Sequence, residues 1–199
     1  MEQIIALEWK MFDRVHNPGG RAACQNDPKR FAGMRASQFA AWSPELRDCY
    51  WQDLQQAAAQ GRNVMQEKYA YMMARTCPAE YAAIQAYLPP LVPEKKPVID
   101  RLCEIHVQNM ERLAARYPRV IGRGRPIRRQ ADSPQVTSSE TYLWGELQTY
   151  SRKMLGLLTA YAAQLARAGQ NLDEIILQNT VAYYGYASLE DAENALRGT

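Results

Sequence analysis

A short glycine-containing stretch, NPGGRAACQNDP over residues 17–28, carries the side chains best suited to chemistry in the first part of the chain. Its glycines can present backbone N–H groups to an anion, and Arg21, Cys24, Gln25 and Asp27 add a cation, a thiol, an amide and a carboxylate. The glycine spacing matches neither a P-loop nor a dinucleotide fingerprint. The alternative is a tight connection in which the glycines end a helix and Cys24 is a small buried apolar residue.

A second loop of similar composition, RVIGRGRPIRRQADSPQVTSSE, covers residues 119–140 and contains Arg123 and Arg125. It overlaps a run over residues 112–131 that has seven arginines and no acid. Because the planar guanidinium suits phosphate and carboxylate, we expect an anionic partner at this stretch. A mobile basic loop on nucleic acid is disfavoured, since the stretch has few aromatic side chains for stacking and the formal net charge is only +3.

Polar side chains around both loops form the candidate ligand-binding set. If the loops meet, their arginines would surround an anionic ligand; the alternative is that they form ordinary ion pairs with neighbouring acids. Glu140 and Glu146 are no catalytic pair, because six residues along a helix place them on different faces, and no catalytic residue is assigned. The set is Arg21, Gln25, Asp27, Arg35, Gln38, Arg123, Arg125, Glu140 and Glu146.

Arg101 and His106 have the R-x4-H spacing of a class of small helical ribonucleases, in which both residues serve the scissile phosphate. Arginine is so frequent in this chain that the match is weak. The alternative is a histidine on the flank of a mostly buried helix, with Arg101 pointing to solvent.

The sequence predicts neither a metal site nor a cofactor. The four cysteines lie at least 25 positions apart, which favours reduced thiols and offers no zinc motif. Glu67 and Lys68 are adjacent on a helix and cannot face each other, so we expect separate contacts and an exposed Lys68.

The composition is that of a globular protein: 47% of the 199 residues are hydrophobic and 23% are charged. No apolar run is long enough to span a bilayer, and the first residues lack the features of a signal peptide. We therefore expect a cytoplasmic protein without a membrane partner.

Apolar residues recur at helical spacing almost throughout, and alternating strand-like runs are missing, so we predict an all-α fold. Gly61 with Asn63, and Gly169 with Asn171, predict two tight turns, each with an asparagine that caps a new helix. One helix is expected before each turn, the second running from about residue 139 to 168. Pro44 would kink the first of these two helices unless Ser43 caps a helix that begins at Pro44.

The two turns are separated by 108 residues, and at this offset Trp42 aligns with Tyr150, Ser43 with Ser151 and Leu46 with Met154. We therefore predict a single compact helical domain over residues 1–199, built from two diverged pseudo-repeats of about four helices each. The halves would span about 1–88 and 98–199, with a linker at about 88–97, and would pack about a pseudo-twofold axis.

The stretches GGRAACQND, MRASQFAAW, GRNVMQEKYAYMM and ETYLWGELQTYS together resemble a bacterial family, domain of unknown function 4125. The resemblance covers nearly the whole chain and implies a single unit in a bacterial cytoplasm. It implies no substrate, cofactor or catalytic residue.

From the sequence we expect a binding or regulatory module for a small anionic ligand or a protein partner. The alternative is an enzyme that acts on a phosphorylated or carboxylated substrate, including the ribonuclease-like possibility. A purely structural interaction protein is a third class, and the oligomeric state stays open.

Overall fold

The fold is all-α, as predicted. The computed structural model describes residues 1–16 and 20–198, so positions 17–19 of the first predicted loop lie outside the described residues. Within the described ranges, no strand forms beyond one isolated bridge between Ser133 and Val136. The α-helices are α1 (Glu2–Phe12), α2 (Pro28–Ala40), α3 (Pro44–Ala59), α4 (Val64–Thr76), α5 (Pro78–Ile84), α6 (Lys96–Arg116), α7 (Pro118–Gly122), α8 (Ser139–Gln148), α9 (Arg152–Arg167), α10 (Leu172–Tyr183) and α11 (Leu189–Ala195).

In the part of the chain that the structure describes, five short 3-10 helices lie between or after these elements. They are η1 (Ala23–Asn26), η2 (Gln85–Tyr87), η3 (Pro93–Lys95), η4 (Arg129–Ala131) and η5 (Leu196–Gly198). The described residues thus form five α-helices up to residue 84 and six from residue 96, more than the four expected in each half.

Capping side chains decide where the central helices begin. Ser43 accepts from the Leu46 N–H and Pro44 takes the first helical position, so the chain starts a new helix there instead of kinking. Ser151 accepts from the Met154 N–H in the same way, so the single long helix predicted over 139–168 is wrong and is divided into α8 and α9.

The two predicted glycine–asparagine turns are present. Gly61 and Gly169 have φ values of 70° and 72°, in the left-handed region that glycine tolerates best. Asn63 and Asn171 then accept N–H groups at the starts of α4 and α10. The side chain of Gln66, three residues after Asn63, does not return a bond to this cap but contacts the backbone of His16.

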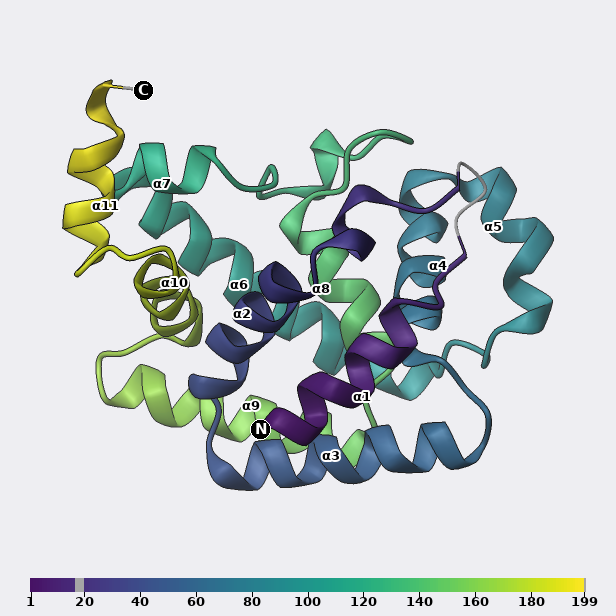
Figure 1. Cartoon of the computed structure of the whole chain (residues 1–199). Helices are drawn as coiled ribbons and strands as arrows, with labels where there is room; N and C mark the ends of the chain where they lie inside the picture. Colours follow the sequence, from purple (N-terminus) through teal and green to yellow (C-terminus); the bar gives the residue numbers. More distant parts are fainter. Residues whose placement is uncertain (17–19, 199) are drawn as a thin grey trace.

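The helices pack in matching sets across the two parts of the chain. Helix α1 contacts α2, α3 and α4, while α6 contacts α8, α9 and α10. Helix α4 packs on α8, α10 packs on α2, and α3 packs on α9, which runs along the same edge in Figure 1. The duplication itself stays a prediction at this point.

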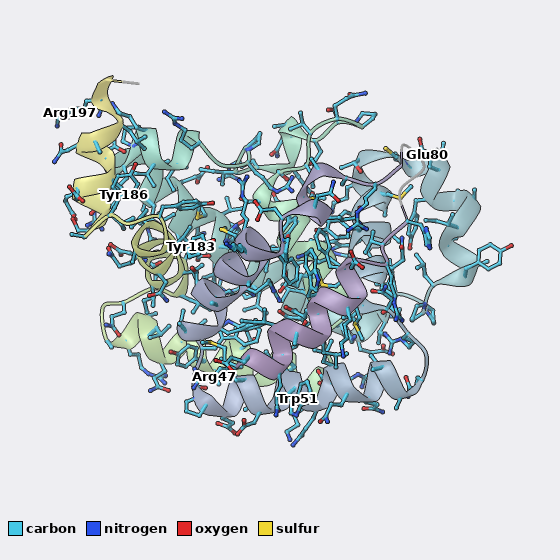
Figure 2. All side chains as sticks on the ribbon, in the orientation of Figure 1. Arg47, Trp51, Glu80, Tyr183, Tyr186 and Arg197 are labelled. Atoms are coloured by element: carbon cyan, nitrogen blue, oxygen red, sulfur yellow. The ribbon has the colours of Figure 1, made fainter. Side chains whose placement is uncertain are left out.

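The largest apolar cluster is shared by both parts of the chain. Phe39, Trp42 and Tyr50 from α2 and α3 and the turn between them pack with Leu147 and Met154 from α8 and α9. A smaller cluster joins α6, α7, α10 and α11, at the end of the molecule opposite α5 (Figure 1). Tyr183 of α10 lies against α2, where its hydroxyl donates to the Lys29 carbonyl oxygen (Figure 2).

No helix in the described ranges is both long enough and apolar enough to cross a membrane.

Two glycines test the closeness of the α4–α8 contact. A Cβ at Gly145 would lie 2.8 Å from the Lys68 carbonyl oxygen and 2.7 Å from Met72 Cγ, whereas Gly156 on α9 has open space. We expect Gly145→Ala to lower the free energy of unfolding by about 1–3 kcal/mol through overpacking. The control Gly156→Ala should raise it by roughly 0.5–1 kcal/mol. Urea unfolding of both variants measures this, and equal effects would contradict the close packing.

Candidate functional site

A buried group of charged and phenolic side chains lies where α1, α2, α4 and α8 meet. We call it the ionic centre. All of its members are buried, and they come from α1, α2, α3, α4 and α8 and from the turn after α8. They are Glu8, Arg35, Tyr50, Lys68, Glu146 and Tyr150.

Arg35 binds Glu8 in the two-pronged geometry that guanidinium and carboxylate groups favour. Its Nε donates to Glu8 Oε2 at 2.7 Å and its Nη2 to Glu8 Oε1 at 2.5 Å, while the Tyr50 hydroxyl also donates to Oε1 at 2.7 Å. Burial opposes the charge of Arg35, but Glu8 and Glu146 outweigh that effect and raise the arginine pKa. Glu8 has no exposed surface, so this pair fastens α1 to α2 from within.

Glu146 is the second acid of the ionic centre and gathers four donors. Lys68 Nζ donates to Oε2 at 2.6 Å, and the Tyr150 hydroxyl donates to Oε1 at 2.7 Å. Gln38 Nε2 and Arg35 Nη1 donate to Oε1 at 3.1 and 3.3 Å. Burial alone would raise the pKa of Glu146, but the charges of Lys68 and Arg35 prevail and hold it well below its usual value.

The ionic centre has as many acids as cations, and its charged groups bind partners within the chain. Its two acids face two cations, and burial together with the acids raises the pKa values of Tyr50 and Tyr150, so both hydroxyls stay protonated donors. Each charged group has its partners within the chain, which suits a structural role better than a reactive one. The expectation that Lys68 is exposed is wrong, since its side chain is only 2% exposed.

The first predicted loop is held by its own side chains. Arg21 bonds to Asp13, to Asn26 and to the carbonyl oxygens of Asp13 and Gln25. Gln25 is buried, and its amide donates to the carbonyl oxygens at the end of α1. Asp27 caps α2 through the Arg30 N–H. Cys24 is exposed, contrary to the alternative of a buried thiol.

The second predicted loop is tied to α8 in a similar way. Arg125 donates to the Thr137 carbonyl oxygen, and its guanidinium lies 4.8 Å from the centre of the Tyr142 ring. Glu140 accepts from the Arg129 N–H and lies 3.9 Å from Arg75. Arg123 is exposed. In these contacts the loop arginines bind groups of the protein itself.

Two aromatic side chains lie beside the second loop. The rings of Tyr69 and Tyr142 lie 6.4 Å apart, with Lys68 Nζ 3.5 Å from the centre of the Tyr142 ring. Burial, followed by the contact with Tyr142, raises the pKa of Tyr69, and both Cys24 and Arg125 act on that pKa as well. Of the nine predicted residues, Arg35, Gln38 and Glu146 bind one another directly at the ionic centre.

A cavity of about 330 Å³ lies on the other side of Gln38 and Tyr150, between α6, α8, α9 and α10. Most of its wall is apolar, with a polar patch from α6 and from the start of α10. Gln38 is the only one of the nine predicted residues in its wall. The lining comprises Gln38, Trp42, Leu102, Ile105, His106, Asn109, Arg112, Leu143, Leu147, Tyr150, Leu158, Ala162, Ala166, Gly169, Gln170, Asn171, Leu172, Asp173 and Ile176.

His106 and Asp173 form the polar patch of this cavity. His106 Nδ1 lies 2.6 Å from Asp173 Oδ1, and Asn109 donates to Asp173 Oδ2 at 2.8 Å. The other ring nitrogen, His106 Nε2, is buried and has no hydrogen-bond partner in the described part of the chain. Arg112, one turn and a half along α6, is an exposed residue in the same wall.

The ribonuclease-like pair does not share this wall. Arg101 is exposed, as the alternative expected, and is not among the residues that line the cavity. Five residues along an α-helix rotate about 140°, so Arg101 and His106 point in different directions. Among the described residues, no group of three His, Cys, Asp or Glu side chains could hold a metal ion. Burial also raises the pKa of the Cys103 thiol to about 12.

Sequence reasoning missed the partners of the predicted residues. Glu8 is the clearest case, because it lies four residues after Ile4 and four before Phe12 on the buried stripe of α1. An acid within such a stripe signals a buried cation elsewhere. His106 and Asp173 gave no such signal, since their pairing joins helices that are distant in the sequence.

Comparison with known proteins gives one match. The model of the family described as "Protein of unknown function (DUF4125)" matches residues 1–194. A search of the curated proteins and a search of the solved structures each found no match.

Lys68 tests whether the ionic centre stabilises the fold. We expect Lys68→Met to lower the free energy of unfolding by about 3–5 kcal/mol, because Glu146 would lose its closest cation in a buried site. Lys153→Met, at an exposed position of α9, should change it by less than about 0.5 kcal/mol. Urea unfolding compares the two, and a small effect of Lys68→Met would contradict a stabilising centre.

Glu146 predicts a loss of stability in acid. Its folded pKa is depressed, so its contribution is complete above the unfolded pKa of about 4.3 and is lost as pH falls toward the folded value. The difference in stability between wild type and Glu146→Gln should therefore shrink between about pH 5.5 and pH 3. Glu80→Gln, at an exposed end of α5 (Figure 2), is the control and should show no such trend. A difference independent of pH would refute the assignment.

Proposed function

From the premise that this chain belongs to the DUF4125 family, whose description names no activity, we propose that it is a binding module for a small, mostly apolar molecule with an anionic group. The ligand would occupy the cavity between α6, α8, α9 and α10. The observation that carries the proposal is the buried, unpartnered Nε2 of His106 in the described part of that wall.

The size and lining of the cavity suit such a ligand. Binding pockets for small molecules typically measure about 300–1,000 Å³ and are mostly apolar with a few placed polar groups. This cavity measures about 330 Å³, and Trp42, Leu143, Leu158 and Ile176 supply much of its apolar wall. A ring or short branched chain would bury most of its surface there.

The His106–Asp173 pair defines one polar contact. Asp173 is the natural acceptor for a proton on His106 Nδ1, and this tautomer leaves Nε2 as a hydrogen-bond acceptor. Buried polar atoms in proteins almost always have a partner, so a ligand hydroxyl or amine would satisfy Nε2. We therefore expect the ligand to present a donor at this point.

Arg112 defines the anionic contact. It lines the cavity, its side chain is at an exposed position, and no ion pair or hydrogen bond engages it among the described residues. A guanidinium at the edge of an apolar cavity suits a carboxylate or phosphate. The anionic ligand predicted from the sequence is thus retained, but at α6 instead of at the two glycine–arginine loops.

An enzyme is the second candidate function, since an Asp-oriented histidine is the usual arrangement of a general base. The cavity lining offers no serine, threonine or cysteine nucleophile, so such a base would act on a hydroxyl of the ligand or on water.

We also propose a bacterial cytoplasmic setting, which the four free cysteines support.

A thermal-shift titration with simple aromatic probes tests the binding proposal. We expect 3-phenyllactate, which has a ring, a hydroxyl and a carboxylate, to raise Tm more than phenylacetate or 2-phenylethanol at equal concentration. Inorganic phosphate should give no shift, because it lacks an apolar body. A ligand at 100 times its Kd stabilises by about 2.7 kcal/mol.

Matched variants locate the binding site. Arg112→Ala should weaken phenyllactate binding about tenfold or more, as expected for the loss of a charged hydrogen bond. Arg101→Ala, which removes an exposed arginine of the same helix outside the cavity, should leave binding unchanged. Equal effects of the two substitutions, or the lack of a shift with every aromatic probe, would overturn the proposal.

A further inference from the structure

Several helices of the two parts of the chain correspond at the 108-residue offset. Helices α3 and α9 span 44–59 and 152–167, and α2 and α8 end at residues 40 and 148. The capping residues Ser43 and Asn63 recur as Ser151 and Asn171. The same offset places α4 on α10. Helix α1 is paired with α6 by its matching helix contacts alone, because the offset would place α1 at residues 110–120 and α6 spans 96–116.

Equivalent residues also contact each other directly, as residues on a twofold axis do. Gln38 bonds to its own counterpart Glu146 at 3.1 Å. The rings of Trp42 and its counterpart Tyr150 lie 6.3 Å apart and perpendicular to each other. Both contacts lie between the ionic centre and the cavity.

The ionic centre and the cavity exchange places under this correspondence. Arg35 corresponds to Leu143, Tyr50 to Leu158 and Lys68 to Ile176, and all three counterparts line the cavity. Glu146 corresponds to Gln38 and Tyr150 to Trp42, and these two line it as well. Glu8, the remaining member, lies on α1, whose place is taken in the second half by α6 with His106 and Asn109.

We infer that the fold builds one binding niche twice, and that the ionic centre is the first-half niche, filled by the chain's own side chains. In the second half the two cations are replaced by leucine and isoleucine and one acid by glutamine, and a cavity lies at that position. The first half therefore holds a latent site for a small apolar molecule. This inference does not depend on the ligand class proposed above.

The cost of burying an unpaired charge explains why the cations and the acids differ together between the two niches. A buried cation is stable only with its acid, so loss of Arg35 or Lys68 equivalents in one half requires loss of the acids too. Position 38 is glutamine, the neutral counterpart of Glu146, as this coupling requires. Removing long charged side chains without adding larger apolar ones leaves open volume.

The test is to give four positions of the first niche the residues of the second and to neutralise Glu8. The variant Glu8→Gln, Arg35→Leu, Tyr50→Leu, Lys68→Ile and Glu146→Gln removes all four charges together, so no buried ion is left unpaired. Calorimetric titration with 2-phenylethanol should show one more binding site per chain than the wild type. The readout is the number of binding sites gained over the wild type, so the test is valid even if the natural cavity binds no probe. A cooperatively folded variant without an added site would overturn the inference.

The reverse exchange covers the case in which that variant fails to fold. Leu143→Arg introduces the first-half cation into the cavity, and Gln38→Glu supplies the corresponding acid. Gln38→Glu alone should lower Tm, because it brings a second carboxylate against Glu146. The readout is therefore the double-mutant cycle: the double variant should melt at least about 5 °C above the sum of the two single effects, because its arginine regains a partner. Strictly additive effects would show that the two niches are not equivalent.

Discussion

Glu146 is the residue on which the arrangement of the central helices depends. It lies on α8 and takes hydrogen bonds from Lys68 of α4 and from Arg35 and Gln38 of α2. Through Arg35 the same network reaches Glu8 of α1. A buried carboxylate has a large cost of desolvation unless cations and donors surround it, so these four helices have to meet at one point. This geometric demand is more specific than apolar packing, which tolerates many helix orientations.

The wall between the ionic centre and the cavity connects this constraint to the binding site that we propose. Gln38 and Tyr150 each contact Glu146 and also line the cavity. A ligand in the cavity would therefore lie one side chain away from the residue that orders α2, α4 and α8. The hydrogen bonds to Glu146 fix the positions of Gln38 and Tyr150 in the cavity wall. Polar groups that are held in place before a ligand arrives favour specific binding.

Local signals in the sequence predicted the helices well and the sites only in part. The all-α class and the Asn63 and Asn171 caps follow from helical periodicity and capping chemistry, which depend on neighbouring residues. The division of α8 from α9 was missed because Ser151, with neither glycine nor proline beside it, is an inconspicuous cap. Arg35, Gln38 and Glu146 were selected as polar residues, but their partner Lys68 was assigned to the surface, since adjacency to Glu67 says nothing about a contact 78 residues away. The apolar cavity lining looks like ordinary core in the sequence, because a cavity is a property of volume and not of residue type.

The residues that align at the 108-residue offset acquire a physical meaning only from their places in the structure. Taken alone, the alignment of Leu143 with Arg35 and of Ile176 with Lys68 looks like random divergence. In the structure these substitutions converge on one cavity, and their charged counterparts converge on one ionic centre. Coupled loss of two cations and an acid is the change that desolvation energetics allows, whereas loss of one charge at a time would leave an unpaired ion. Under the correspondence that we infer, one copy of the niche stabilises the fold and the other is open to the ligand that we propose.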